Sequence, residues 1–226
     1  MSHPLLSLLQ LSDPALPIGG YAHSGGLETY VQVGVVRDVG TAGRFVREML
    51  SRNLFYTDAA LMALAYKAGN GGGGDLWELD ALCEAVKLPK EVRQSSRKLG
   101  GRLLKIFRGM GMAGMPDYER AVREKGTPGH YSIVFGYCAA TLGVGLREAL
   151  TGYYYNAAAG MITNCVKLIP IGQQDGQILL FGLQPLIAEL VEGTMEPDRD
   201  LIGYCCTGLD IRCMQHETLY SRLYMS

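Results

Sequence analysis

LLQLSDPALPIGGYAHSGGLETY, residues 8–30, is the stretch around which the rest of the chain is organised. Leucines open it, and two prolines followed by paired glycines then form a turn. Proline fixes φ near about −65° and glycine permits positive φ, so this turn has few conformations open to it. The turn presents Tyr21, His23 and Ser24 immediately before Gly25-Gly26-Leu27-Glu28. We infer that it positions a specific group or surface.

One chemistry that this turn could serve is nucleophilic catalysis by Ser24. Its sequence, Ala22-His23-Ser24-Gly25-Gly26, comes within one residue of the G-x-S-x-G elbow, in which a strained strand-to-helix turn exposes the serine oxygen. The elbow needs a buried strand before it, and Pro17-Ile18-Gly19-Gly20 does not favour a strand. His23 would also point away from Ser24 in most backbone geometries. A serine hydrolase is therefore an alternative that the pattern does not favour.

Composition narrows the class of protein. The 226 residues suffice for one sizeable core, and a net charge of −1 gives no electrostatic reason to expect nucleic acid or an anionic membrane as a partner. Hydrophobic residues make up 48% and charged residues 19%, a balance that favours surface buried against partner proteins.

The sequence has no long apolar segment, no secretion signal and no C-x-x-C pair among its cysteines. We expect a cytoplasmic protein with reduced thiols.

Hydrophobic periodicity along the chain is helical. Apolar residues recur at three- and four-residue steps from Thr41, an expected N-cap, to Ala68, as one long helix or two in line with a break near Asn53. Further helices are expected at 75–87, 90–110, 117–125, 130–140, 147–168, 178–191 (with a kink or restart at Pro185) and 209–224. The pattern predicts an all-α fold, a single bundle-like domain of about eight to ten helices over residues 1–226, with a flexible glycine-rich loop at 69–74.

Two of these helices have further features. The helix at 130–140 is rich in glycine and alanine, which let backbones approach closely in the centre of a bundle. The helix at 90–110 has a basic face, which is either solvated charge or a docking face for an acidic partner. The residues of that face are Arg93, Arg97, Arg102, Lys105 and Arg108.

Motifs for nucleotide or metal chemistry are mostly absent. The sequence lacks G-x-x-x-x-G-K-[ST], so we do not expect the chain to bind or hydrolyse nucleotide by itself. His216-Glu217 has no second histidine four residues on, as a zinc protease requires. A cluster of soft ligands that suit Ni²⁺ or Zn²⁺ is formed by Cys205, Cys206, Cys213 and His216. A nickel-binding storage protein is thus a second alternative, although buried core residues explain this cluster more simply. His23 and His130 are likewise expected to be structural.

The opening stretch resembles the N-terminal signature of the UreF family of urease accessory proteins, which carry an LLQL-type segment, an S/D-x-x-L-P-x-G turn and a Y/F-x-H/Y-S-x-G-L-E run. Four later segments resemble further motifs of the family, in the same order. They are Ser95 to Leu104, Gly129-His130-Tyr131 with Gly136 and Gly143, Leu168 to Gln173 with Gln177, and His216-Glu217 with Tyr220-Ser221-Arg222-Leu223. Five motifs in the right order make chance agreement implausible.

The resemblance implies an all-α, non-enzymatic maturation factor. Members of the family dimerise, bind the accessory protein UreD (also called UreH) and recruit the nickel-carrying GTPase UreG, so that Ni²⁺ reaches the urease apoprotein. The resemblance therefore implies that no cofactor is stably bound and that nickel is delivered by the assembled complex. A role in modulating the GTPase is also implied.

Ten residues in or beside these motifs are candidates for partner-binding or channel-lining roles. They are Tyr21, His23, Ser24, Glu28, Lys167, Gln173, Gln177, His216, Glu217 and Arg222. Each could instead cap a helix or satisfy a buried backbone group. The turns Pro17 to Gly26 and Pro170 to Gln177 are expected to be rigid and to preset partner-facing groups, which lowers the ordering cost of assembly. No catalytic and no metal-binding residue is expected.

Overall fold

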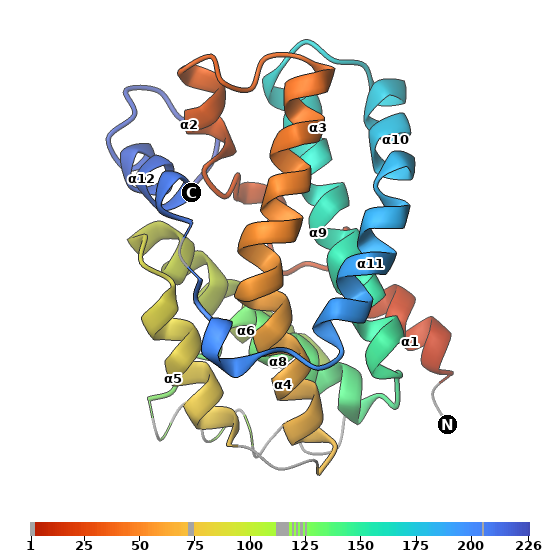
Figure 1. Ribbon diagram of the computed structural model, residues 1–226. Helices are drawn as coiled ribbons and strands as arrows, with labels where there is room; N and C mark the ends of the chain where they lie inside the picture. Colours follow the sequence, from red (N-terminus) through yellow and green to blue (C-terminus); the bar gives the residue numbers. More distant parts are fainter. Residues whose placement is uncertain are drawn as a thin grey trace.

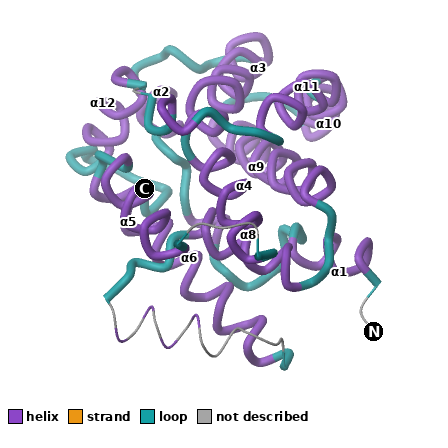
Figure 2. Tube along the Cα trace, turned by 60° about the horizontal axis from the view of Figure 1, so that its bottom comes forward, coloured by secondary structure: helices purple, strands orange, loops and turns teal. Residues whose placement is uncertain are grey.

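A computed structural model describes residues 3–71, 75–111, 126–204 and 206–226, together with the single positions 118, 120, 122 and 124. Within these residues the secondary structure is helix, turn or loop, with no strand (Figure 2). The prediction of an all-α bundle is confirmed. The predicted helix at 117–125 falls mostly, and Gly72 to Gly74 entirely, outside the described residues.

Eleven α-helices lie in the described ranges (Figure 1). They are α1 (Pro4–Leu11), α2 (Leu27–Gln32), α3 (Val39–Glu48), α4 (Asp58–Gly69), α5 (Leu76–Val86), α6 (Lys90–Gly109), α8 (Tyr131–Thr141), α9 (Leu146–Leu168), α10 (Gln173–Gly182), α11 (Gln184–Thr194) and α12 (Thr207–His216). Three short segments join them: η1 (Gly20–Ala22), the π-helical η2 (Met49–Leu54) and η3 (Arg199–Leu201). This agrees with the expected all-α bundle of about eight to ten helices, to which the structure adds α1 and α2, where no helix was predicted.

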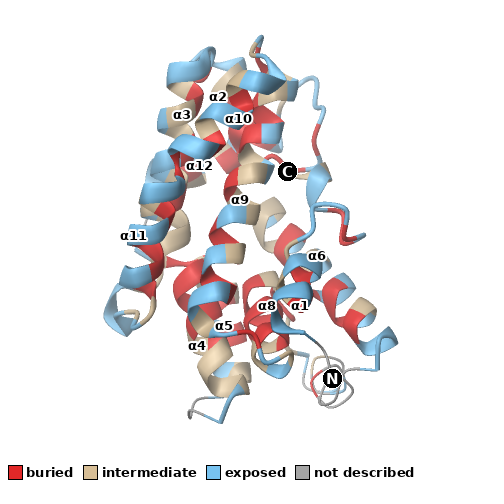
Figure 3. Ribbon diagram, turned by 90° about the vertical axis from the view of Figure 1, so that its right-hand side faces the viewer, coloured by how far each residue is buried: buried red, intermediate tan, exposed pale blue. Residues whose placement is uncertain are grey.

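The long helix α9 organises the core. It packs against α1, α2, α3, α4, α8, α10 and α11. Its aromatic residues interlock with neighbours: Tyr153 stacks on Tyr131 of α8 with ring centroids 5.8 Å apart, and the buried Tyr154 hydroxyl is hydrogen-bonded to Thr194 of α11 at 2.8 Å. The outer sides of α10 and α11 are exposed while their inner sides are buried (Figure 3). A single apolar core thus forms around α9.

Helices α4 and α8 approach each other closely where they cross. A Cβ atom placed on Gly136 would lie 2.3 Å from the Met62 carbonyl oxygen and 3.2 Å from the Ala65 Cβ. No side chain larger than hydrogen fits there without a shift of the backbone. The expected role of small residues at 130–140 is confirmed at this crossing.

Replacing Gly136 with alanine should therefore destabilise the fold. We expect the free energy of unfolding to fall by about 1–3 kcal/mol, because the added methyl group overpacks the α4–α8 contact. Gly101 is the matched control, since it is a helical glycine of α6 with nothing within 4 Å of its missing Cβ. Gly101→Ala should stabilise by about 0.5–1 kcal/mol through helix propensity. Urea denaturation of both variants tests this, and equal effects would contradict it.

The junction between α3 and α4 carries the break expected near Asn53. Residues 49–54 widen into a π-helix between the two α-helices, so of the two predicted alternatives, one long helix or two in line, the structure has the second. The expected N-cap at Thr41 is wrong. The cap is Asp38, whose carboxylate accepts the Thr41 amide at 2.8 Å, while the Thr41 hydroxyl accepts the Asp38 amide at 3.0 Å. This reciprocal capping box makes Thr41 the third helical residue.

Helix α10 begins earlier than the predicted helix at 178–191. It starts at Gln173 because the Asp175 carboxylate accepts the Gly172 amide at 3.0 Å and caps the first turn. The prediction of an extended turn from Pro170 to Gln177 is therefore wrong beyond Gly172. The last five of its eight residues, Gln173 to Gln177, are helical.

The C-terminal part of the chain departs most from the helical expectation. The restart near Pro185 is confirmed, because α10 ends at Gly182 and Pro185 lies in the first turn of α11. The predicted helix at 209–224 stops at His216, and the following ten residues form turns and extended chain. None of the helices in the described ranges combines the length and hydropathy that crossing a bilayer requires.

Candidate functional site

The last residues of the chain fold back onto the opening turn. The Met225 amide donates to the Ala22 carbonyl at 2.9 Å, and the Ser226 carbonyl oxygen accepts the amides of Ser24 at 2.5 Å and Gly25 at 3.2 Å. The Ser226 hydroxyl is hydrogen-bonded to Nδ1 of His23 at 2.8 Å. We call residues 217–226 the tail. The tail and the opening turn thus form one structural unit.

The opening turn is held in place by glycine conformations and by neighbouring helices. Gly19, Gly25 and Gly26 have φ values of 85°, 60° and 85°, which side chains with a Cβ rarely adopt. Arg102 of α6 donates to the Ile18 carbonyl at 2.8 Å, which fixes the turn to the bundle. The expected rigidity of Pro17 to Gly26 has this structural basis.

Glu28 is the acceptor that holds the tail. Its carboxylate accepts the amides of Leu223 at 2.7 Å and Tyr224 at 3.1 Å, and it contacts Nε2 of His216 at 3.0 Å. Burial alone would raise the pKa of Glu28, but the hydrogen bonds from Leu223, His216 and Tyr224 outweigh it and lower that pKa. These bonds explain why α12 does not continue to Tyr224: the amides that a helix would use are taken by Glu28.

His216 lies between two carboxylates. Its Nε2 faces Glu28 at 3.0 Å and its Nδ1 faces Glu91 of α6 at 2.7 Å. Both ring nitrogens thus lie within hydrogen-bonding distance of a carboxylate oxygen, and the ring bridges the two acidic side chains. Arg222 of the tail adds a cation to this cluster, because it donates to Glu91 at 2.7 Å. We call Glu28, Glu91, His216 and Arg222 the tail clamp.

The structure brings together half of the predicted site residues. His23, Ser24, Glu28, His216 and Arg222 all contact the tail or belong to the tail clamp. Tyr21 lies next to this unit on η1, with 74% of its surface exposed. The predicted residues Lys167, Gln173, Gln177 and Glu217 are exposed and do not enter the clamp.

Two of those exposed residues lie far from the tail. Gln173 and Gln177 belong to α10, and Figure 1 places α10 and α12 on opposite sides of α3. Lys167 lies in the last turn of α9, which ends at Leu168 shortly before α10 begins at Gln173. The resemblance-based candidates therefore fall on two separate surfaces.

Glu91 is the clamp residue that sequence reasoning missed. It lies in the first turn of α6, where an acidic residue has an ordinary explanation in the helix dipole. Its partners His216 and Arg222 are more than a hundred residues away in sequence, so no local spacing connects them. Arg222 was marked only by the resemblance, and His216 both by the resemblance and as a candidate metal ligand.

His130 belongs to a second buried polar cluster. This agrees with the expectation that His130 has a structural role. Its Nδ1 is hydrogen-bonded to Ser96 at 3.0 Å and its Nε2 to Glu84 at 2.8 Å. Asp80 accepts the backbone amides of Gly129 at 2.6 Å and His130 at 2.8 Å. This cluster joins α5, α6 and the start of α8.

The basic face of α6 is partly used inside the chain. Arg93 donates to the Lys87 carbonyl at 2.8 Å, Arg97 pairs with Glu84, and Arg102 holds the opening turn. These three side chains therefore mainly make contacts within the chain. They are not simply solvated, and docking of an acidic partner is not their main role. The carboxylates and carbonyls that they bind belong to the chain itself.

The geometry does not support the hydrolase alternative. Ser24 is buried, and its Oγ accepts the Glu28 amide at 3.5 Å, while His23 turns to Ser226. Burial and the nearby charges of Lys98 and Arg102 lower the pKa of His23. The arrangement lacks the serine–histidine contact that activates a nucleophile.

The metal alternative has no geometric support either. Burial raises the pKa of the Cys213 thiol to about 12, which disfavours the thiolate that binds metal. Both nitrogens of His216 are occupied by carboxylates. In the part of the chain that the structure describes, which leaves out Cys205, no group of three histidine, cysteine or acidic residues could hold a metal ion.

Comparison with known proteins gives consistent matches. The UreF family model matches residues 36–184. A urease accessory protein UreF from Haemophilus influenzae (strain PittGG) is 47% identical over 222 residues, covering 97% of this chain and 94% of the relative. The UreF of Actinobacillus pleuropneumoniae serotype 3 (strain JL03) is 45% identical over 97% of this chain and 98% of its own length. That of Paenarthrobacter aurescens (strain TC1) is 36% identical over 98% and 97%.

Proposed function

Because the chain belongs to the UreF family of urease accessory proteins, we propose that it is a non-catalytic adaptor in urease maturation. In this proposal it binds UreD/UreH and recruits the GTPase UreG in the cytoplasm. The assembled complex delivers nickel to the urease apoprotein, and this chain modulates the GTPase. It holds no stable cofactor of its own.

The observation that carries the proposal is the docked tail. It joins the opening turn and the end of the chain into one ordered surface, so that little conformational entropy is lost when a partner binds. Four apolar or aromatic side chains on this surface are exposed to solvent: Tyr21, Tyr220, Leu223 and Met225. Aromatic residues of this kind are common anchors of protein interfaces. We propose that this surface binds UreD/UreH.

The proposal also includes a homodimer within the complex. The helix α1 leaves three leucines, Leu5, Leu6 and Leu9, more than half exposed. A contiguous leucine face is unusual on a surface that stays in water. We propose that contact between two copies of the chain covers it.

Restoration of urease activity tests the function. The chain is produced in a urease-positive bacterium from which its own UreF has been deleted, and urease activity and enzyme-bound nickel are measured. We expect both to return. If urease remains nickel-free although the chain is folded and abundant, the proposed function is wrong.

Tyr21→Ala tests the proposed surface. We expect affinity for UreD/UreH to fall by about thirtyfold or more, as for an aromatic anchor, with unchanged thermal stability because Tyr21 is exposed. Tyr204→Ala is the matched control, since Tyr204 is an exposed tyrosine on the loop before α12. Equal affinities of the two variants would place the interface elsewhere.

A further inference from the structure

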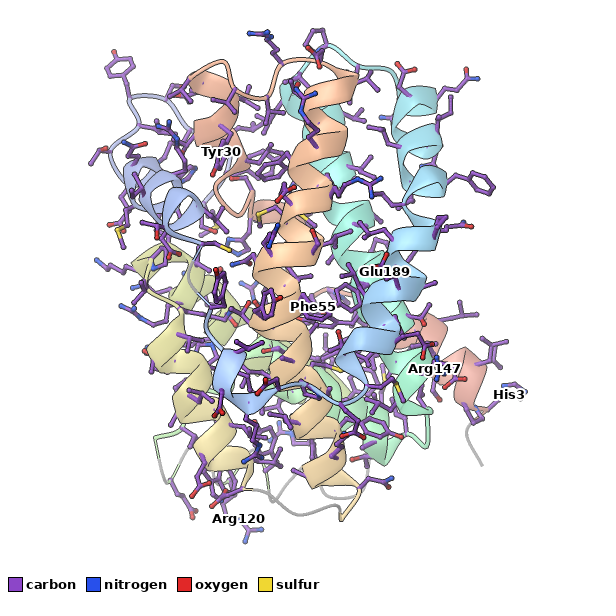
Figure 4. All side chains as sticks on the ribbon, viewed as in Figure 1. His3, Tyr30, Phe55, Arg120, Arg147 and Glu189 are labelled. Carbon is purple, nitrogen blue, oxygen red and sulfur yellow. The ribbon has the colours of Figure 1, made fainter. Side chains whose placement is uncertain are left out.

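A pocket separate from the tail clamp opens between α2, α3, η2 and the start of α12. Its volume is about 490 Å³. Its apolar walls are formed by Tyr30, Val36, Phe45, Met49 and Leu209. In Figure 4 the Tyr30 ring lies between α2 and α3. The size falls within the range of sites that receive a ligand or a large side chain, roughly 300–1,000 Å³.

The walls of this pocket are fixed before any partner arrives. The rings of Tyr30 and Phe45 pack with centroids 5.4 Å apart, and the Arg212 guanidinium covers the Tyr30 ring at 5.9 Å. The capping box at Asp38 and Thr41 anchors the start of α3. One wall of the pocket includes residues of the π-helical η2. A π-helix is a rare geometry overall, but where it occurs it often lies at a functional site.

Charged side chains surround the rim of the pocket. Arg52 and Glu48 pair across one helical turn at 3.7 Å. Asp38 is engaged by the amide and hydroxyl of Thr41. Arg44, also on the rim, makes no ion pair or hydrogen bond within the described part of the chain, although its charge acts on nearby Asp38 and helps to lower the pKa of that carboxyl. A guanidinium beside an apolar pocket is complementary to a carboxylate next to an apolar group.

The apolar surface continues beyond the pocket. Val33 and Val35, on the loop between α2 and α3, are each 49% exposed, and Val35 also lines the pocket. Because the rim residues Arg44 and Arg52 are exposed, the pocket is open to solvent along α3. A small molecule would leave this side in water, whereas a protein segment would cover both the pocket and the valines.

We propose that the pocket is a docking site for a partner protein, and that it receives a bulky apolar side chain whose neighbouring carboxylate pairs with Arg44. The site goes beyond the proposed function because it adds a second surface, and it does not depend on the tail clamp. It predicts an acidic, amphipathic segment in one of the proteins that meet this chain during urease maturation.

Photo-crosslinking in cells tests the proposal. Benzoylphenylalanine replaces Val35 in the full chain, produced with urease and the other accessory proteins, and crosslinked peptides are identified by mass spectrometry. The same probe at Arg47, an exposed position of α3 outside the pocket, is the control. We expect a crosslink from position 35 only, to a peptide with aspartate or glutamate within two residues of the crosslinked apolar residue.

Reversing the charge of Arg44 tests whether the crosslink depends on the proposed ion pair. Arg44→Glu should lower the crosslink yield by about tenfold, and changing the partner carboxylate to lysine should restore it, whereas Arg47→Glu should have no effect. A crosslink that is insensitive to Arg44→Glu, a crosslink to a second copy of this chain, or none above the control would each overturn the proposal. Urease activity in the same cells separates the two proposals, because normal activity without the crosslink refutes the pocket alone.

Discussion

The His216→Ala variant is expected to lose about 3–5 kcal/mol of unfolding free energy, which is the cost of leaving buried charges uncompensated. In the native chain the imidazole lies between the carboxylates of Glu28 and Glu91, and both its ring and the Glu28 side chain are almost fully buried. Without the ring these two carboxylates lose the group that bridges them and is hydrogen-bonded to both. Urea denaturation measures the loss.

Arg222→Ala is the control for this prediction. Arg222 also binds Glu91, but its side chain is partly exposed, so we expect a loss of no more than about 1 kcal/mol. The His216→Ala variant should in addition release the tail, which limited proteolysis after residue 216 would detect. A tail that stays protected in His216→Ala would show that the clamp does not hold it.

Glu28 of the tail clamp makes the free energy of unfolding depend on pH. The pKa of Glu28 is lowered from its ordinary value of 4.5 in the folded chain, so the unfolded chain takes up a proton first as the pH falls. The stabilisation by Glu28 is therefore complete above pH 4.5 and is lost as the pH falls through the lowered folded value. Glu28→Gln should accordingly show less loss of stability than the native chain across that acidic range.

The second large effect is expected at the buried ion pair between Lys87 and Asp58. The ammonium donates to both carboxylate oxygens, at 2.8 Å and 2.7 Å. Burial alone would raise the pKa of Asp58 and lower that of Lys87, but their mutual attraction outweighs it, so the Asp58 pKa is lowered and the Lys87 pKa is raised. Lys87→Met leaves Asp58 buried without its cation, and we expect a loss of about 3–5 kcal/mol.

A double variant separates the broken pair from the lost packing. Asp58→Leu combined with Lys87→Met replaces both charges by apolar groups, and it should recover most of the stability, because well-packed hydrophobic replacements of buried ion pairs are often neutral. Lys67→Met is the exposed control, since its partner Glu196 is largely in solvent, and we expect at most about 1 kcal/mol. A double variant no more stable than Lys87→Met would contradict the electrostatic explanation.

Helical periodicity predicted the interior of the bundle well. The ranges of α5, α6, α8 and α9 follow from apolar spacing, and the restart at Pro185 follows from the missing amide of proline. These features are local, so the sequence carries them directly. The N-cap of α3 was misplaced for a related reason: Asp38 and Thr41 are both good capping residues three positions apart, and only the geometry shows which of them is the cap.

The tail could not be predicted from local pattern. Residues 217–224 continue a helical spacing of apolar residues, but Glu28 lies nearly two hundred residues away and takes the amides of Leu223 and Tyr224. A tertiary contact thus overrides helix propensity, as propensity alone is a weak guide. The resemblance to UreF marked Glu28, His216 and Arg222 as important, whereas their assembly into one charged cluster with Glu91 required the structure.

The central claim is that this chain joins the other accessory proteins into one assembly. Native mass spectrometry of the chain co-produced with UreD/UreH and UreG, with and without GTP and nickel, tests it most directly. We predict one species that contains all three proteins and two copies of this chain. The claim would be contradicted if the chain remained alone under conditions in which another UreF protein, run in parallel as a positive control, does form a complex with its own partners.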